Sequence, residues 1–159
     1  MVKILVSDNL AKEGVDQLRT IRDAEVTFKT GMSPQELMEV IPEYDGLVVR
    51  SATKVTTEIL EAAKNLKLVG RAGIGVDNIN LKAATDKGVI VMNTPFGNSI
   101  TTAEHAIAMM FAAARKIPQA SASTHSGKWE KKKFQGKEVY GKTLGIVGLG
   151  NIGRIVCKR

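Results

Sequence analysis

Short aliphatic runs alternate with segments of helical spacing through the first 93 residues of the chain. Five of these runs have the length of buried strands, at residues 3–6, 25–28, 46–49, 66–69 and 89–92. Segments with helical spacing lie between them, at residues 10–18, 56–64 and 80–87. No hairpin signal joins the strands, so the pattern predicts an α/β fold with a doubly wound parallel sheet of flavodoxin-like type.

A further helix start is visible at Ser33–Pro34–Gln35–Glu36. Ser33 is an N-cap residue, Pro34 suits the first helical position, and Glu36 closes a capping box. Thr56 is a second N-cap candidate, and Gly88 is expected to end the helix that precedes it. These local signals predict helices between successive strands.

The alternating pattern breaks at Thr94–Asn98, where Pro95 and Gly97 interrupt regular structure. We therefore expect one domain over residues 1–97. Residues 98–159 are expected to form a linker helix and the start of a second domain.

The linker helix, Ile100–Arg115, is rich in Ala and Met and is apolar around almost its whole circumference. Such a helix is expected to be buried between two bodies or between two subunits. Pro118 is expected to end it, and residues 127–141 are expected to form a polar loop.

The last apolar run, Thr143–Val147, reads as a strand that leads into Gly148, Gly150 and Gly153. The spacing G-x-G-x-x-G after a strand is typical of a dinucleotide-binding turn, whose helix N-terminus binds the phosphates. The acidic residue that binds the ribose would lie about 20 residues further on, past the last residue given. A plain strand–turn–helix connection is the alternative.

Hydrophobic content, the single cysteine and the net charge indicate what kind of core, compartment and partners to expect. The 159 residues are 43% hydrophobic but only 4% aromatic, so we expect an aliphatic core. Cys157 is the one cysteine, which excludes an intramolecular disulfide; we expect a buried, inert thiol in a reducing cytoplasm. The net charge of +7 is scattered except at Lys128–Lys133 around Trp129, which favours a solvated loop over a nucleic-acid patch. We expect a cytoplasmic protein without nucleic-acid, membrane or metal partners.

Ligands of parallel α/β sheets bind beyond the carboxyl ends of the strands, where strand order reverses. This rule selects the segments that follow the predicted strands, which are Ser7–Asp8, Arg50–Thr53, Arg71–Gly75 and Asn93–Ser99. Arg50 and Arg71 suit a carboxylate or phosphate, with domain-bridging salt bridges as the alternative. Gly73 and Gly75 leave backbone N–H groups bare for a carboxylate or a nicotinamide.

Neutral hydrogen-bond donors at the break in the pattern come from Asn98 and Ser99. The chain has two histidines. His105 lies among apolar helix positions, where we expect a core histidine rather than a general base, and His125 is expected in the exposed loop. No serine-nucleophile motif occurs.

Several motifs taken together resemble the D-isomer-specific 2-hydroxyacid dehydrogenase family, and within it the enzymes that act on 3-phosphoglycerate. They are Val49–Thr56, Gly70–Ile79, Asn93–Ser99, and Gly127–Trp129 followed by Gly148–Gly153. The resemblance implies a substrate domain followed by the start of an NAD-binding Rossmann domain. It also implies oxidation of 3-phosphoglycerate to 3-phosphohydroxypyruvate with NAD⁺, the first step of serine biosynthesis.

The same resemblance implies site residues. Positions on the substrate side are matched by Arg50, Ser51, Arg71, Gly73, Asn98 and Ser99. Positions on the cofactor side are matched by Ile74, Gly148, Gly150, Asn151, Ile152 and Gly153. Ile74 stands where some members have Thr beside the nicotinamide, so a hydroxyl contact is lost. The linker helix matches the dimer-forming segment, which implies a homodimer or tetramer.

The family's catalytic histidine, its orienting glutamate and its catalytic arginine come late in the sequence, beyond Arg159. We therefore expect no catalytic residue in this chain and no turnover by the chain alone. Two alternatives stay open. One is a dehydrogenase or reductase for another D-2-hydroxy acid, such as glyoxylate or hydroxypyruvate; the other is a non-catalytic binding or dimerisation module.

Overall fold

The computed structural model describes residues 1–159, which form two units, unit 1 (Met1–Gly97) and unit 2 (Asn98–Arg159). Unit 1 contains a five-stranded sheet in the order β2-β1-β3-β4-β5, with every neighbouring pair parallel. The strands are β1 (Val2–Val6), β2 (Ala24–Phe28), β3 (Gly46–Val49), β4 (Leu68–Arg71) and β5 (Ile90–Asn93). The strand order reverses between β1 and β3, as in flavodoxin-like sheets, so the predicted fold class is confirmed.

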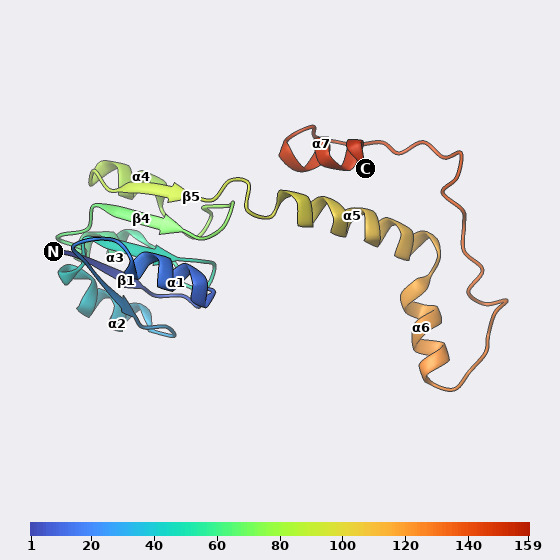
Figure 1. Ribbon diagram of the computed structural model, residues 1–159, viewed down its shortest axis with the longest axis horizontal. Coiled ribbons are helices and arrows are strands. Elements are labelled where there is room, and N and C mark those ends of the chain that lie inside the picture. The colour runs from blue at the N-terminus through green and yellow to red at the C-terminus, as the bar shows by residue number, and fades with distance from the viewer. The chain divides into compact units, whose positions relative to one another are not determined.

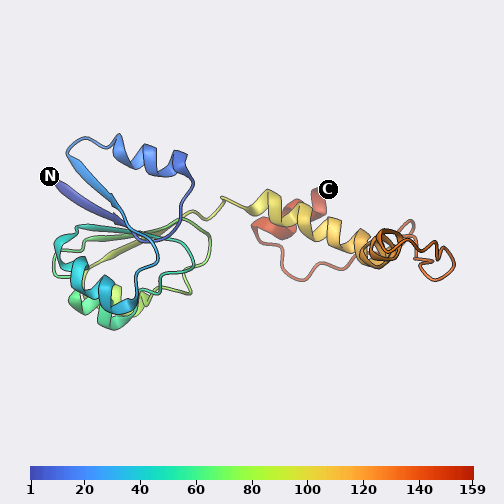
Figure 2. The same cartoon turned by 90° about the horizontal axis from the view of Figure 1, so that it is seen from below.

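Helices cover both faces of this sheet (Figures 1 and 2), with α1 on one face and the others on the opposite face. They are α1 (Lys12–Arg19), α2 (Pro34–Val40), α3 (Thr57–Ala62) and α4 (Leu81–Asp86), with a short 3-10 helix, η1 (Ile41–Glu43), after α2. Each helix connects two parallel strands, which is the doubly wound arrangement that the alternating pattern predicts.

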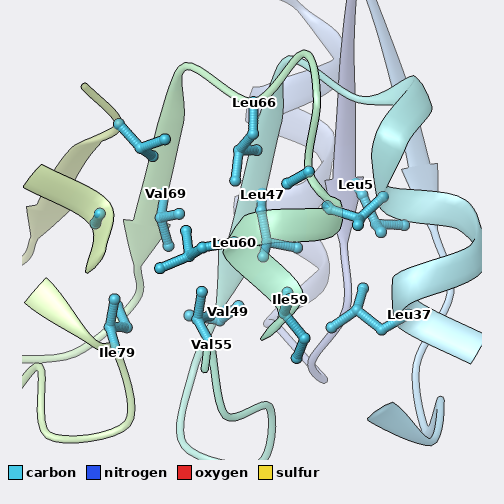
Figure 3. Packing of buried hydrophobic residues seen from close by; sticks show 14 residues of the cluster. Leu5, Leu37, Leu47, Val49, Val55, Ile59, Leu60, Leu66, Val69 and Ile79 are labelled. Atoms are coloured by element: carbon cyan, nitrogen blue, oxygen red, sulfur yellow. The ribbon is translucent and has the colours of Figure 1, made fainter. Parts of the chain in front are cut away.

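The main core of unit 1 lies between the sheet and α2, α3 and α4. Figure 3 shows Leu47 and Val69 of the sheet on the same side as Leu60 of α3, and all three are fully buried. The opposite face is only partly covered. Ile90 and Met92 alternate with Val91, which packs on the core, and they stay 60% and 56% exposed.

The predicted helix caps are present. Ser33 Oγ accepts a hydrogen bond from Glu36 N (3.2 Å), and Ser33 N donates one to Glu36 Oε2 (2.7 Å), which closes the capping box at α2. Thr56 caps α3 through Ile59 N. Gly88 follows α4 with a φ of +68°, a conformation that favours glycine. Short-range sequence signals thus set these helix ends.

Unit 2 contains α5 (Ser99–Ala114), α6 (Ile117–His125) and α7 (Asn151–Lys158). Figure 1 shows α5 and α7 side by side, and Arg159 Nη2 forms a 2.6 Å ion pair with Glu104 Oε1. Only Ser99 and Ala103 are buried in this unit. No helix of the chain is long and apolar enough to cross a membrane.

The linker helix expected at residues 100–115 is present as α5, which ends at Ala114 before Lys116 takes a left-handed φ of +52°. The role given to Pro118 and the strand at residues 143–147 are wrong. Pro118 lies in the first turn of a new helix, α6, where a missing N–H costs nothing. Residues 143–147 do not form a strand, because unit 2 offers no second strand to pair with them.

The apolar residues Ile100 and Met109 of α5 are 58% and 54% exposed in this single chain, so burial of the helix against another body or subunit stays a prediction. Two other burial predictions in unit 2 fail. His105 is exposed rather than in a core, and Cys157 is exposed rather than buried. The reason is shared: the helices of unit 2 have no sheet to pack against, so helical spacing of apolar residues does not produce a core there.

Candidate functional site

The carboxyl ends of β1 and β3 meet where the strand order of the sheet reverses. Asp8 follows β1, Arg50 follows β3, and Arg71 is the last residue of the neighbouring strand β4. Parallel sheets bind their ligands at this point, so these residues form the candidate substrate site.

The Asp8 carboxylate is almost completely buried, at 3% exposure, and organises the loop after β3. It accepts hydrogen bonds from the backbone N–H groups of Arg50 (2.7 Å), Ala52 (3.1 Å) and Thr53 (3.0 Å). The Thr53 hydroxyl donates a further bond to Asp8 Oδ1. This arrangement, the Asp8 clasp, ties the end of β1 to residues 50–53.

Burial by itself would raise the pKa of Asp8, because it disfavours the charged form. The hydrogen bonds from Thr53, Arg50 and Ala52 outweigh burial, so the pKa of Asp8 lies below its usual value. Asp8 is therefore a carboxylate at neutral pH and acts as an acceptor, not as a proton donor.

The Arg71 side chain is hydrogen-bonded to the backbone of Arg50. Arg71 Nε donates to the Arg50 carbonyl oxygen (3.1 Å), and Arg50 Nη1 donates to the Asn9 carbonyl oxygen (3.2 Å). Neither guanidinium forms an ion pair within unit 1. Two cations without counter-ions at one sheet edge suit a carboxylate or phosphate.

The loop after β4 lies against the Arg71 side chain. A Cβ atom added to Gly73 would stand 2.7 Å from Arg71 Nη1, and one added to Gly75 would stand 3.5 Å from the same atom. A side chain at Gly73 would therefore displace the guanidinium or the loop, whereas one at Gly75 would meet Asp77 Oδ1 at 2.7 Å and make only an ordinary contact with Arg71. Gly73 N donates back to the Arg71 carbonyl oxygen (2.9 Å), so the bare backbone donors are the N–H groups of Ile74 and Gly75.

The end of β5 fixes this loop from the other side. Asn93 Nδ2 donates to the Ile74 carbonyl oxygen (2.6 Å), and Thr94 N donates to the Gly73 carbonyl oxygen (3.0 Å). The residues selected at the ends of four strands, β1, β3, β4 and β5, are thus in one hydrogen-bonded assembly.

Asn78 also holds the Arg50–Thr53 loop, a role that no pattern in the sequence indicates. Its Nδ2 donates to the carbonyl oxygens of Arg50 (2.8 Å) and Thr53 (2.7 Å), while its Oδ1 is buried without a partner. Ser51 is exposed beside it. An open groove of about 710 Å³ is lined by Ser51, Lys54, Val55, Thr56, Thr57, Glu58, Asp77, Asn78, Ile79 and Asn80.

The glycine fingerprint forms a tight turn in unit 2. Gly148 has a φ of +99°, Gly150 is the N-cap of α7, and a Cβ on Gly153 would collide with the Gly148 carbonyl oxygen. The N–H groups of Asn151 and Ile152, in the first turn of α7, have no intrahelical partner. The turn therefore has the features that admit a pyrophosphate: close backbone approach and helix N–H donors.

The remaining candidate residues begin unit 2. Asn98 is the exposed N-cap of α5 and makes no capping bond, whereas the Ser99 hydroxyl is buried without a hydrogen-bond partner. Both histidines belong to unit 2, and unit 1 has none. No group of three or more His, Cys, Asp or Glu side chains is placed to hold a metal ion.

Comparison with known proteins matches residues 4–147 to the family model "D-isomer specific 2-hydroxyacid dehydrogenase, catalytic domain". A D-3-phosphoglycerate dehydrogenase of Archaeoglobus fulgidus is 56% identical over 99% of this chain, and the chain spans 30% of that relative's length. A hydroxypyruvate reductase of Thermotoga maritima is 51% identical over 99% of the chain and 51% of its own length.

A similar fold occurs in a solved structure of the NAD⁺-bound 3-phosphoglycerate dehydrogenase of Entamoeba histolytica. That chain is 33% identical, with a TM-score of 0.78 over 99% of this chain and 49% of its own length.

Proposed function

The chain belongs to the D-isomer specific 2-hydroxyacid dehydrogenase family, and we propose that it supplies the substrate domain of an enzyme that oxidises 3-phosphoglycerate to 3-phosphohydroxypyruvate with NAD⁺. The observation that carries this proposal is the pair of arginines at one end of the sheet, Arg50 and Arg71, which are linked by the hydrogen bond from Arg71 Nε to the Arg50 carbonyl oxygen and have no counter-ions. 3-Phosphoglycerate has two anionic ends, and forked donors match both carboxylate and phosphate.

Each part of the site has a task in this proposal. Arg50 and Arg71 bind the anionic groups, and Ser51 adds a hydroxyl at the groove. The N–H groups of Ile74 and Gly75 add donors, while Gly73 keeps space for Arg71. Asn98 and Ser99 add neutral donors. Binding energy from the charged ends would orient the carbon that reacts.

The cofactor side rests on the turn at Gly148–Gly153. Bound NAD⁺ would supply the hydride acceptor. The N–H groups of Asn151 and Ile152 would hold its pyrophosphate, Gly148, Gly150 and Gly153 would permit the approach, and Ile74 would offer an apolar contact to the nicotinamide. NAD⁺ and NADP⁺ are distinguished by the residue that contacts the ribose, which is not among the residues named above. Both cofactors are therefore to be assayed.

Proton transfer is not assigned to these residues. Unit 1 has no histidine, and the Asp8 carboxylate is occupied by hydrogen bonds. We propose that the 159 residues alone bind the acid without turning it over, and that the activity belongs to the whole enzyme.

The decisive experiment measures NADH formation by the complete enzyme, after intact mass has established which polypeptide is present. 3-Phosphoglycerate is compared with D-glycerate, which lacks the phosphate. We expect a much higher kcat/KM for the phosphorylated acid, and a larger loss for it than for glycerate in Arg50→Gln and Arg71→Gln. Equal kcat/KM values for both acids would refute the assignment of the substrate.

A second candidate is reduction of hydroxypyruvate or glyoxylate. It is favoured by the Thermotoga maritima reductase, which is 51% identical to the chain over a larger share of its own length than the Archaeoglobus protein. Reverse assays with NADH and either oxo acid distinguish the two. A complete polypeptide with no turnover on any of these acids would instead support a binding or dimerisation module.

We also propose that α5 mediates a homodimer or tetramer. Its support is the exposure of large apolar side chains, Ile100 (58%), Met109 (54%) and Phe111 (42%), on one helix. Sedimentation of wild type and Met109→Glu tests this: the variant is expected to shift toward monomer, and an unchanged mass would contradict the role of α5.

A further inference from the structure

Asp8 is the one buried charged residue of the chain, and all of its donors are neutral. A buried carboxylate is costly unless several hydrogen bonds satisfy it. Here those bonds do not come from its own strand or helix. They come from the loop that carries Arg50, more than 40 residues away along the chain.

The Asp8 clasp continues beyond the carboxylate. Because the single proton of the Thr53 hydroxyl points to Asp8, the buried Ser7 hydroxyl is the donor in its 2.9 Å contact with Thr53 Oγ1. On the other side, the peptide that begins with Arg50 offers its carbonyl oxygen to Arg71 Nε and Asn78 Nδ2. Asp8 therefore holds the Arg50 backbone, which carries the Arg50 side chain and accepts the hydrogen bond from Arg71 Nε.

We propose that Asp8 is a positioning residue of the substrate site, whose carboxylate presets the Arg50–Thr53 loop and so places Arg50 and Arg71 for an incoming anion. This role rests on the proposed function, since it assumes that the two arginines bind the anionic acid. Asp8 itself does not touch the substrate in this assignment.

Electrostatics and positioning predict opposite results at this residue. A negative charge near an anion site repels the anion, so removing the charge alone would tighten binding. Removing the clasp would loosen the loop and weaken binding. In Asp8→Asn the shape is kept, but an NH₂ group meets backbone N–H donors where Oδ2 accepted them, so the clasp is broken while the charge is lost.

Asp45 offers a matched control at the amino-terminal ends of the strands, opposite to the end where Asp8 lies. It directly precedes β3, accepts a hydrogen bond from Lys3 N (3.0 Å) and pairs with Lys67 Nζ (3.1 Å). Asp45→Asn thus removes a carboxylate that also ties two strands together, but far along β3 from the candidate site. It separates general weakening of unit 1 from loss of positioning.

The experiment compares steady-state kinetics of the complete enzyme as wild type, Asp8→Asn and Asp45→Asn. We expect Asp8→Asn to raise KM for 3-phosphoglycerate about tenfold or more, with a smaller change in kcat and an unchanged KM for NAD⁺. Asp45→Asn should leave all three within about twofold of wild type. A KM that falls or stays constant in Asp8→Asn, or rises equally in Asp45→Asn, overturns the positioning role.

A second variant and a second readout cover other failures. If Asp8→Asn does not fold, Thr53→Val removes the hydroxyl from the clasp and is expected to raise KM by about threefold. If wild type does not oxidise 3-phosphoglycerate, the proposed function fails, and hydrogen exchange at the amides of Arg50, Ala52 and Thr53 decides the inference. Their exchange should quicken in whichever of the two variants folds and not in Asp45→Asn; unchanged exchange refutes the clasp.

Discussion

The apolar runs Gly46–Val49 and Thr143–Val147 have similar residues, but only the first is a strand. In unit 1, Leu47 pairs with Leu5 on one side and Val69 on the other, and it is fully buried. In unit 2, Leu144 is 55% exposed and Val147 has no cover at all. The difference lies in the neighbours that the rest of each unit provides.

The helices of the two units differ in the same way. α3 contributes two buried residues, Ile59 and Leu60, to a layer between helices and sheet. α5 is longer and more apolar, yet it buries only Ser99 and Ala103. Intrinsic apolarity therefore does not decide burial; a facing layer does, because most of the stability of a helix comes from packing.

The largest expected contrast is in hydrogen exchange. Amides of β4 are paired on both sides, so they should exchange at least about a thousandfold more slowly than the amides of residues 144–149, which open at almost no cost. Exchange of the isolated chain, followed by NMR, measures both sets in one sample. Comparable protection of residues 144–149 would show that they are paired after all.

A pair of leucine substitutions sharpens the contrast in stability. Leu47→Ala should lower the free energy of unfolding of unit 1 by about 2–5 kcal/mol, since it leaves a cavity in a closed core. Leu144→Ala should change it by less than about 0.5 kcal/mol. Far-UV circular dichroism in denaturant is the suitable probe, because Trp129 lies in unit 2 and is 82% exposed. Similar losses for both variants would contradict the assignment of the core.

The pH dependence of stability is expected to differ between a carboxylate of unit 1, Asp8, and one of unit 2. Because the pKa of Asp8 is lowered in the fold, the stability it contributes is present above its unfolded pKa of about 4 and is lost as pH falls through the lower folded pKa. The stability difference between wild type and Asp8→Asn should therefore shrink on acidification below about pH 4. A difference that stays constant would show that Asp8 contributes through packing alone.

Glu130 of unit 2 is the comparison for this titration. The Ser123 hydroxyl also lowers the pKa of its carboxyl, but that group is only partly buried, unlike Asp8. Glu130→Gln should leave the acid unfolding of unit 1 unchanged, measured in the same buffers.

Short-range signals in the sequence were sufficient for much of unit 1. The five strands and the capping box could be predicted because each depends on residues within a few positions, and the strand-end rule brought Arg50 and Arg71 to one edge. The role of Asp8 could not be predicted, since its partners come from a loop 42 to 45 residues away and depend on strand order.

In unit 2, local patterns predict the turns and helices but not the burial of side chains. The glycine spacing correctly predicts a turn followed by a helix, because Gly148 and Gly153 are required by local geometry. The predictions for residues 143–147, His105 and Cys157 needed a layer to pack on, which no local pattern can supply. The polar pair Ser7–Asp8 directly after the end of β1 remains the one sequence signal that points to the clasp.

The smallest contrast tests a local signal that both units contain. Ser33→Ala removes the side-chain half of the capping box of α2 and should cost about 1 kcal/mol of unfolding free energy, because the backbone N–H of Glu36 loses its acceptor. Asn98→Ala at the N-cap of α5 should cost less than about 0.5 kcal/mol, since Asn98 makes no capping bond there. Both are measured by denaturant unfolding, with helix signal as the readout. If Asn98→Ala cost as much as Ser33→Ala, then Asn98 would cap α5 in solution, and residue type alone, rather than its setting in each unit, would determine the cap.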